Sequence, residues 1–157
     1  MNKVLSAILC LTLTTSMLAS DVGYKIAYDG GSLPDVKAGS TLNLSITSDG
    51  IRLKKEKDKA EVVSIRPASV TELSYGQDVH RRVGTAIGLA VISFGIGALM
   101  ALAKSKKHYI GVTWDDAGKK GGIAFQADKK VYRGILAGLE GVTGKKSVNT
   151  DSLTVKN

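Results

Sequence analysis

The chain has 157 residues, which by length corresponds to one domain. Its 22 Lys and Arg residues outnumber 14 Asp and Glu, so the formal net charge is +8 at pH 7. The only cysteine, Cys10, lies at the N-terminus, which excludes a disulfide framework and a cysteine-based metal site in the rest of the chain.

Residues 1–20 have the layout of a secretory signal peptide. Lys3 is followed by the apolar run Val4 to Leu13, and the small residue Ala19 precedes Ser20. The apolar run is too short to span a bilayer as an anchor helix. We therefore expect cleavage near residue 20 and export to the periplasm or cell envelope. The domain that remains, 21–146, lacks a thiol and keeps an excess of positive charge.

Period-two alternation of apolar residues marks the first half of this domain as β-strands. The alternating residues fall in two sets, Tyr24, Ile26 and Tyr28, and then Leu42, Leu44 and Ile46. Ser48-Asp49-Gly50 follows directly, and Asp-Gly predicts a hairpin in which glycine has a positive φ. Ile51 and Leu53 begin the returning strand.

The second half contains four more predicted strands and one helix. Residues 61–65 and 70–76 form strands separated by Arg66-Pro67, since proline belongs at a strand end. A hairpin over 110–125 turns at 115–120. The apolar period then lengthens, which predicts a helix with Asp128 as its cap and Gly144 as its stop; the apolar stripe is Val131, Ile135, Leu139 and Val142. Residues 147–157 are expected to be a mobile polar tail.

Seven short antiparallel strands followed by a helix resemble the pleckstrin-homology-like fold, a bent β-barrel closed by its C-terminal helix. The chain also resembles a group of exported bacterial proteins of unknown function, through Val70 to Gln77, Arg81-Arg82, an apolar stretch, and Lys106 to Tyr109. The resemblance implies an α+β class with an inserted apolar helix or hairpin. Phosphoinositide binding is not carried over, because the loop 29–40 has only Lys37 as a basic residue.

Residues 83–103 form an uncharged, glycine-containing apolar segment. As a helix, 21 residues extend roughly 30 Å, which is the thickness of a hydrocarbon core. Nine Val, Ile, Leu or Phe residues favour insertion, whereas four glycines oppose it. A domain of this size has too little protein to surround such a helix, so we expect contact with a membrane or with a second subunit.

Small residues follow one side of this segment on a helical wheel. They begin with a GxxxG pair and permit close approach of two helices in lipid; the members are Gly84, Gly88, Val91, Gly95 and Ala98. An equally good interpretation is a re-entrant hairpin that bends at residues 95–97. Basic residues flank both ends and are expected to contact anionic head groups; they are Arg81, Arg82, Lys104, Lys106 and Lys107.

The sequence contains no motif that indicates catalysis or cofactor binding. His80 and His108 are isolated from each other, and Asp115-Asp116 lies in a turn, so no metal-ligand set is expected. Gly30-Gly31 and Gly121-Gly122 lack the context of a phosphate loop and are interpreted as turn glycines. Export argues against nucleic acid as the partner of the positive charge. Tyr75, Tyr109 and Trp114 fit either an interfacial aromatic belt or ordinary packing within the fold.

These patterns predict a non-enzymatic, exported, membrane-associated binding or structural module. Its expected partners are an anionic lipid bilayer, a second copy of itself, or another envelope protein. One alternative is a single-pass envelope protein with residues 104–157 on the cytoplasmic side, which agrees with positive-inside bias but separates two predicted strands. The other alternative is a soluble secreted oligomer.

Overall fold

The computed structural model describes residues 23–76, 79–86 and 108–151, without the side chains of residues 80 and 81. These residues form an α+β fold that is mostly sheet. Its elements in chain order are β1 (Gly23–Gly31), β2 (Thr41–Ile46), β3 (Ile51–Lys55), β4 (Glu61–Ile65), η1 (Pro67–Ser69), β5 (Val70–Tyr75), α2 (Val79–Ala86), β6 (His108–Asp116), β7 (Lys119–Ala127), α4 (Tyr132–Thr143) and β8 (Ser147–Asn149).

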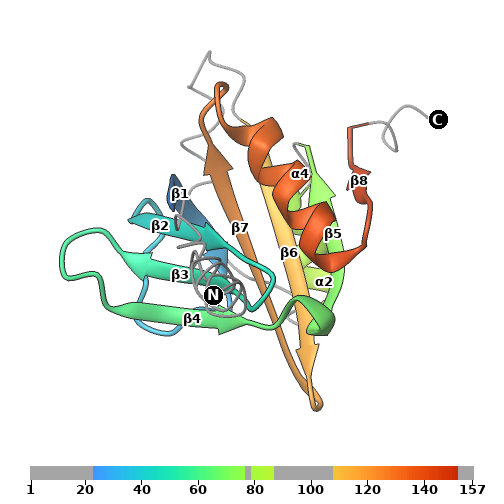
Figure 1. Cartoon of the computed structure of the whole chain (residues 1–157), viewed down its shortest axis with the longest axis horizontal. Helices are drawn as coiled ribbons and strands as arrows, with labels where there is room; N and C mark the ends of the chain where they lie inside the picture. The colour runs from blue at the N-terminus through green and yellow to red at the C-terminus, as the bar shows by residue number, and fades with distance from the viewer. Residues whose placement is uncertain (1–22, 77–78, 87–107, 152–157) are drawn as a thin grey trace, which may run out of the picture.

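The eight strands form one open sheet in the order β4-β3-β2-β1-β7-β6-β5-β8. Two antiparallel meanders, β1–β4 and β5–β7, are joined where β1 pairs with β7. In Figure 1, β2–β4 cross the direction of β5–β7, so the sheet is bent between its halves. The signal that located these strands, alternation of apolar residues, is confirmed by their burial: Ile26, Leu42, Leu44, Ile51 and Leu53 are all at most 2% exposed.

Helix α4 covers the inner face of the bend and completes the main core. Ile135 and Leu139 are fully buried, and they belong to the same cluster as Ile110, Val112 and Phe125. Figure 1 shows α4 lying across β5 and β6. The predicted apolar stripe of this helix is therefore confirmed as the face that packs on the sheet.

The opposite, outer face of the sheet is covered by α2. Val79 and Val83 are fully buried and form a second cluster with Tyr109 and Ala124. Successive strand residues point to opposite faces, which is why Tyr109 lies under α2 while its neighbour Ile110 lies in the main core. The sheet thus has a helix on each face.

Glycine has a different role from the predicted one at three positions. The hairpin at Ser48–Asp49 is present, with Gly50 N donating to Thr47 O at 3.3 Å, but Gly50 does not have a positive φ. Gly31 lies in β1, not in a turn, and a Cβ on it would be 2.2 Å from Gly122 O. Gly121 lies in β7 under the Trp114 ring, where a Cβ would be 2.3 Å from Cε2. The strands approach closely at Gly31 and Gly121, so these two glycines serve packing.

Helix α4 begins later than the sequence indicated and ends where expected. Asp128 does not cap the helix through its side chain: its Oδ1 accepts from Lys130 N at 2.8 Å, and its carbonyl accepts from Tyr132 N at 3.0 Å. This turn delays the first helical residue to Tyr132. At the other end Gly144 has φ 68° and donates to Glu140 O, so it is confirmed as the stop.

The segment predicted as a polar tail begins with a strand, β8, which pairs parallel to β5. Thr150 follows it, is 2% exposed, and donates its N–H to Tyr75 O at 2.7 Å. Glu140 of α4 holds the start of β8, because its Oε1 accepts from Ser147 N at 2.8 Å and from Ser147 Oγ at 2.7 Å. The alternation signal missed β8 because polar and backbone contacts, not apolar burial, hold these three residues. Residues 152–157 lie outside the described part of the chain.

Attachment of β8 is expected to weaken in acid. Hydrogen bonds from Ser147 and then Lys146 hold the pKa of Glu140 below its usual value. A carboxylate with a lowered folded-state pKa contributes stability above its unfolded-state pKa, and that contribution disappears as pH falls through the folded-state pKa. Glu140→Gln should therefore lose less unfolding free energy than the parent between pH 7 and pH 3 in urea titrations. Glu61→Gln, at an exposed carboxylate 4.0 Å from Arg52, is the control; equal acid sensitivity of parent and Glu140→Gln would contradict the assignment.

Candidate functional site at the base of the apolar segment

The most distinctive region of the sequence, the apolar segment 83–103, leaves the described domain from the helix that follows β5 and rejoins it at β6 of the same sheet. It begins in α2, whose last residue is Ala86, and the chain returns at His108, the first residue of β6. β6 is paired antiparallel with β5, which precedes α2, over the register Val70↔Trp114 to Tyr75↔Ile110. Both flanks of the segment are therefore attached to the same folded unit.

The first residues of the predicted membrane segment pack against protein. Val83 of α2 is fully buried against Tyr109 and Ala124 on the outer face of the sheet, and Gly84 is also buried. Arg82, predicted to contact head groups, donates from Nη1 to Glu72 Oε1 at 2.8 Å, an ion pair that ties α2 to β5. Val83 and Gly84 thus pack within the domain, whereas contact of Arg82 with head groups stays a prediction, since its side chain is 32% exposed.

The remaining predicted site residues lie outside the described residues. They are the small residues Gly88, Val91, Gly95 and Ala98 and the lysines Lys104, Lys106 and Lys107, together with the side chain of Arg81.

Three aromatic rings from different elements stack where the chain returns to the sheet. The rings of His108 and Tyr132 have centroids 3.8 Å apart and are inclined by 3°, and Tyr75 lies 5.6 Å from Tyr132. The Tyr75 hydroxyl and His108 Nδ1 share a hydrogen bond of 2.9 Å. Arg133 extends this group, since its Nε donates to the Tyr132 hydroxyl at 2.9 Å. The stack joins β5, β6 and α4 at one end of the sheet.

The two tyrosines of the stack differ electrostatically. Burial, followed by the nearby Tyr132, raises the pKa of the Tyr75 hydroxyl. The hydrogen bond from Arg133 lowers the pKa of the Tyr132 hydroxyl. The stack thus places two tyrosine hydroxyls beside a guanidinium, an arrangement suited to an interface between water and an apolar phase.

Tyr75, Tyr109 and Trp114 do not form a single aromatic belt, which was one of the two interpretations that the sequence allowed. Tyr109 is 1% exposed on the outer face, and burial together with the charge of Asp29 raises its pKa to about 12. Trp114 packs on the main core on the inner face, towards the opposite end of β6 from His108. The prediction that these residues pack within the fold is confirmed for Tyr109 and Trp114.

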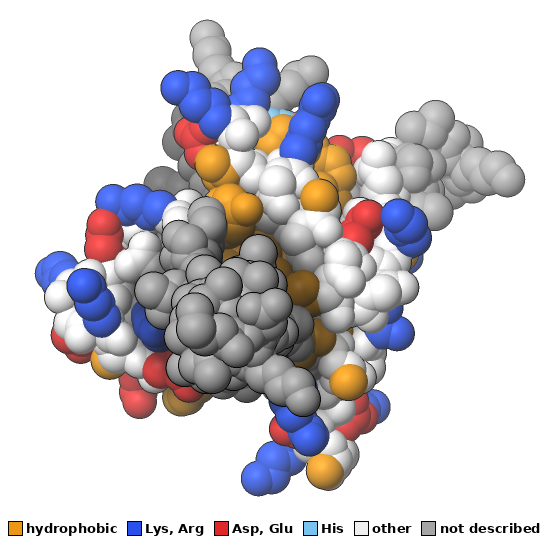
Figure 2. All heavy atoms as spheres, viewed as in Figure 1, with side chains coloured by type: hydrophobic (Ala, Val, Ile, Leu, Met, Phe, Trp, Pro, Cys, Tyr) orange, Lys and Arg blue, Asp and Glu red, His pale blue; other side chains and the backbone are white. Residues whose placement is uncertain are grey.

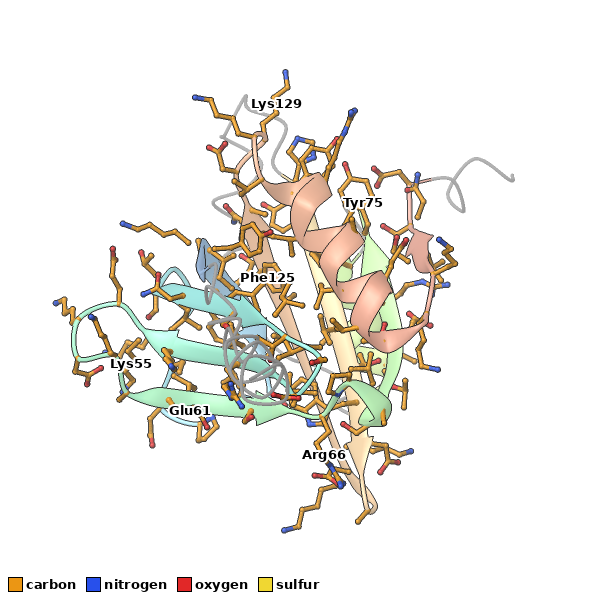
Figure 3. The ribbon with its side chains drawn as sticks, viewed as in Figure 1. Lys55, Glu61, Arg66, Tyr75, Phe125 and Lys129 are labelled. Carbon is orange, nitrogen blue, oxygen red and sulfur yellow. The ribbon has the colours of Figure 1, made fainter. Side chains whose placement is uncertain are left out.

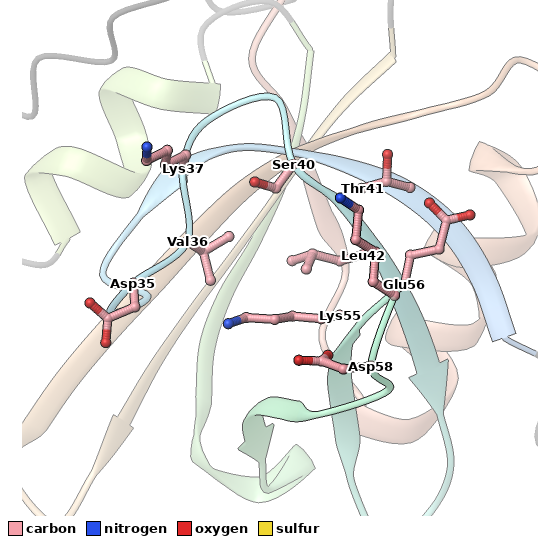
Figure 4. A pocket seen from close by; sticks show the side chains of 10 residues that line it. Asp35, Val36, Lys37, Ser40, Thr41, Leu42, Lys55, Glu56 and Asp58 are labelled. Atoms are coloured by element: carbon pink, nitrogen blue, oxygen red, sulfur yellow. The ribbon is translucent and has the colours of Figure 1, made fainter.

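An open groove of about 410 Å³ lies between the β1–β2 loop and the β3–β4 loop (Figure 4). Val36 and Leu42 form part of its apolar surface. Its charged lining balances, with three lysines against three carboxylates: Lys37, Lys55, Lys57, Asp35, Glu56 and Asp58. Such a lining has no net charge with which to select an anion or a metal ion, so the groove is a weaker candidate than the base of the apolar segment.

Among residues 23–76, 79–86 and 108–151, no three His, Cys, Asp or Glu side chains cluster in a way that suits a metal ion. The same residues include no helix with both the length and the apolar character of a membrane span. No protein-family model matches the chain, and no curated protein shows significant sequence similarity to it.

Sequence reasoning singled out His108 and Tyr75 separately but did not place them together, and it gave Tyr132 and Arg133 no role. Tyr75 and His108 are 33 positions apart in the chain, and Tyr132 is a further 24 positions on. Only the β5–β6 register and the docking of α4 bring them into contact. A tyrosine followed by arginine in the first turn of a predicted helix carries no signal that distinguishes it from ordinary surface composition.

Proposed function

We propose that this protein is a non-enzymatic, exported module that associates with a membrane through the apolar segment 83–103, chiefly through its part beyond α2. The observation that carries the proposal is the pairing of β5 with β6 around the insertion. Because the strands on either side of the insertion, β5 and β6, belong to one sheet, the segment is best explained as an excursion that enters and leaves on the same side. The competing explanation is that a second copy of the chain, and not lipid, covers this segment.

The same pairing argues against the single-pass alternative. A crossing between Ala86 and His108 would place β5 and β6 on opposite sides of a bilayer, and the hydrogen bonds between them would be lost. The buried contacts of Val79 and Val83 with Tyr109 and Ala124 would be lost as well. Each unsatisfied backbone group costs free energy, so a membrane topology that keeps the sheet intact is favoured.

We also propose that the domain is a pleckstrin-homology-like variant. The supporting features are two antiparallel meanders joined through β1 and β7, and a C-terminal helix on the concave face. The sheet is open, with β4 and β8 at its edges, so it departs from a closed barrel. The strand β8 beside β5 is an addition to the seven-strand plan.

Vesicle flotation of the mature chain, residues 21–157, tests the membrane proposal. The parent should float with vesicles of phosphatidylcholine and phosphatidylglycerol. Phe94→Asp with Ile96→Asp should move most of the protein to the unbound fraction, because carboxylates oppose insertion into hydrocarbon. Ala38→Asp with Ser48→Asp adds the same charge at exposed turns and is the matched control, expected to float like the parent.

Each alternative predicts a different result, either in flotation or in cysteine labelling. A parent protein that remains an unbound monomer would reject the membrane proposal. An unbound oligomer that Phe94→Asp with Ile96→Asp dissociates would favour the soluble oligomer. For the single-pass alternative, cysteines introduced at Ser48 and Lys119 should react with an impermeant maleimide from opposite sides of the membrane, whereas our proposal expects both to react from the same side.

A further inference from the structure

Three exposed basic side chains gather where α4 begins. Lys129 and Lys130 lie in the loop after β7, and Arg133 lies in the first turn of α4. The one carboxylate among residues 128–133 is that of Asp128, which accepts from Lys130 N. Figure 2 shows Lys and Arg side chains at this end of the molecule, and Figure 3 places Lys129 there, at the end near Tyr75 and away from Arg66.

Lys129, Lys130 and Arg133, here called the basic surface, lie at the same end of the β6–β7 hairpin as His108, where the chain returns from the apolar segment. The last residue of β7, Ala127, is the register partner of His108. Lys129 and Lys130 are two and three residues beyond that pair. Arg133 is held to the same place through Tyr132, whose ring stacks on His108. The antiparallel pairing of β6 and β7 therefore puts the basic surface beside the base of residues 87–107.

The opposite end of the same hairpin also carries two lysines, but there each lysine is paired with an aspartate. Lys119 and Lys120 are the register partners of Asp116 and Asp115. Asp116 also forms an ion pair with Arg66. β7 has nine residues, so the two lysine pairs are separated by roughly 30 Å along the strand. At the far end each lysine therefore faces an aspartate, whereas among residues 128–133 three basic side chains accompany one carboxylate, Asp128; Asp151 is a further carboxylate near Tyr75.

We infer that Lys129, Lys130 and Arg133 form a second contact with an anionic membrane surface, next to the apolar segment, with Tyr132 at the interface between water and lipid. This inference rests on the proposed membrane association. Lysine and arginine near an anionic leaflet are attracted by its surface potential, and tyrosine is enriched at the level of the head groups. The protein would thus bind through the apolar segment and through a basic surface that lies beside His108, where the chain returns from that segment.

The experiment compares two matched double variants of the mature chain in vesicle flotation. Lys129→Gln with Lys130→Gln removes two charges from the basic surface, and Lys119→Gln with Lys120→Gln removes two from the opposite end of the hairpin. All four side chains are exposed, so both variants should retain the parent circular dichroism spectrum. With vesicles containing phosphatidylglycerol at low salt, the first variant should bind roughly 30-fold more weakly, at about 1 kcal/mol per charge, and the second like the parent.

Vesicles of phosphatidylcholine alone separate the inference from the proposed function. Parent and Lys129→Gln with Lys130→Gln should bind these neutral vesicles equally, because the apolar segment is unchanged. The inference is overturned if both double variants lose the same affinity for anionic vesicles, if neither loses any, or if the parent does not distinguish anionic from neutral vesicles. A parent protein that binds neither kind of vesicle rejects the proposed function itself.

Discussion

Gly111→Ala is expected to destabilise the protein by about 3 kcal/mol and to release α2 from the outer face of the sheet. A Cβ at Gly111 would lie 2.4 Å from Ser74 Oγ, 2.7 Å from Val79 Cγ1 and 2.9 Å from Val83 Cγ2. Both valines are fully buried, so they cannot move aside without moving the helix. Overpacking of a tight contact typically costs about 1–3 kcal/mol, and the upper end applies because three groups are met at once.

Two measurements report this effect. Urea unfolding monitored by circular dichroism gives the change in unfolding free energy, and limited trypsin digestion gives the rate of cleavage after Arg82, which should rise when α2 is released. Gly141→Ala is the matched control, since a Cβ there meets nothing within 4 Å and alanine is favoured over glycine in a helix by about 0.5–1 kcal/mol. The control should be slightly more stable than the parent.

A second-site change distinguishes crowding from other causes. Val83→Ala removes methyl groups from the contact that a Cβ at Gly111 would invade. The double variant should therefore be more stable than the sum of the two single changes implies, because the residues are in contact and their effects are coupled. Strict additivity would show that α2 does not pack over Gly111 as described.

Leu139→Ala is expected to cost about 3 kcal/mol of unfolding free energy. Leu139 is fully buried at the centre of α4, in the cluster that contains Ile110, Val112 and Phe125. Truncation of a buried leucine removes its transfer free energy and leaves a cavity, which together cost about 2–5 kcal/mol. The midpoint of urea unfolding should fall, with little change in the slope.

Leu136→Ala in the same helix is the control for Leu139→Ala. Leu136 is only partly buried at the edge of the core, so the same truncation leaves no enclosed cavity and should cost clearly less. Similar losses at the two positions would mean that α4 does not cover the inner face through Ile135 and Leu139. Because this helix also carries Tyr132 and Arg133, its docking controls the position of the basic surface.

The helix-and-strand pattern of the fold was largely readable from local sequence. Alternation located β1, β2 and β3, and Pro67 correctly separated β4 from β5. Gly144 marked the end of α4. These signals succeed because burial of one face imposes a period of two on a strand and of 3.6 on a helix, and the chain records that period directly.

The failures have a different physical origin. The sequence suggested a glycine with positive φ at Gly50 and turn glycines at Gly31 and Gly121, whereas two of them are required by close contacts with Gly122 and Trp114. The sequence also did not indicate the ion pair between Arg82 and Glu72. The contact of Gly31 with Gly122 joins residues far apart in the chain, and those of Gly121 with Trp114 and of Arg82 with Glu72 depend on strand pairing and helix docking, so no local periodicity identifies them.

The sequence by itself determined the type and approximate bounds of most elements, the apolar character of residues 83–103, and the apolar face of α4, since these depend on composition and period along the chain. Tertiary structure alone decided that β1 pairs with β7, that α2 covers the outer face, and that β8 joins the sheet. It also brought Tyr75, His108 and Tyr132 together beside Lys129 and Lys130. Strand order and helix docking are set by packing and hydrogen bonds between segments far apart in the chain, which leave no periodic mark on either segment alone.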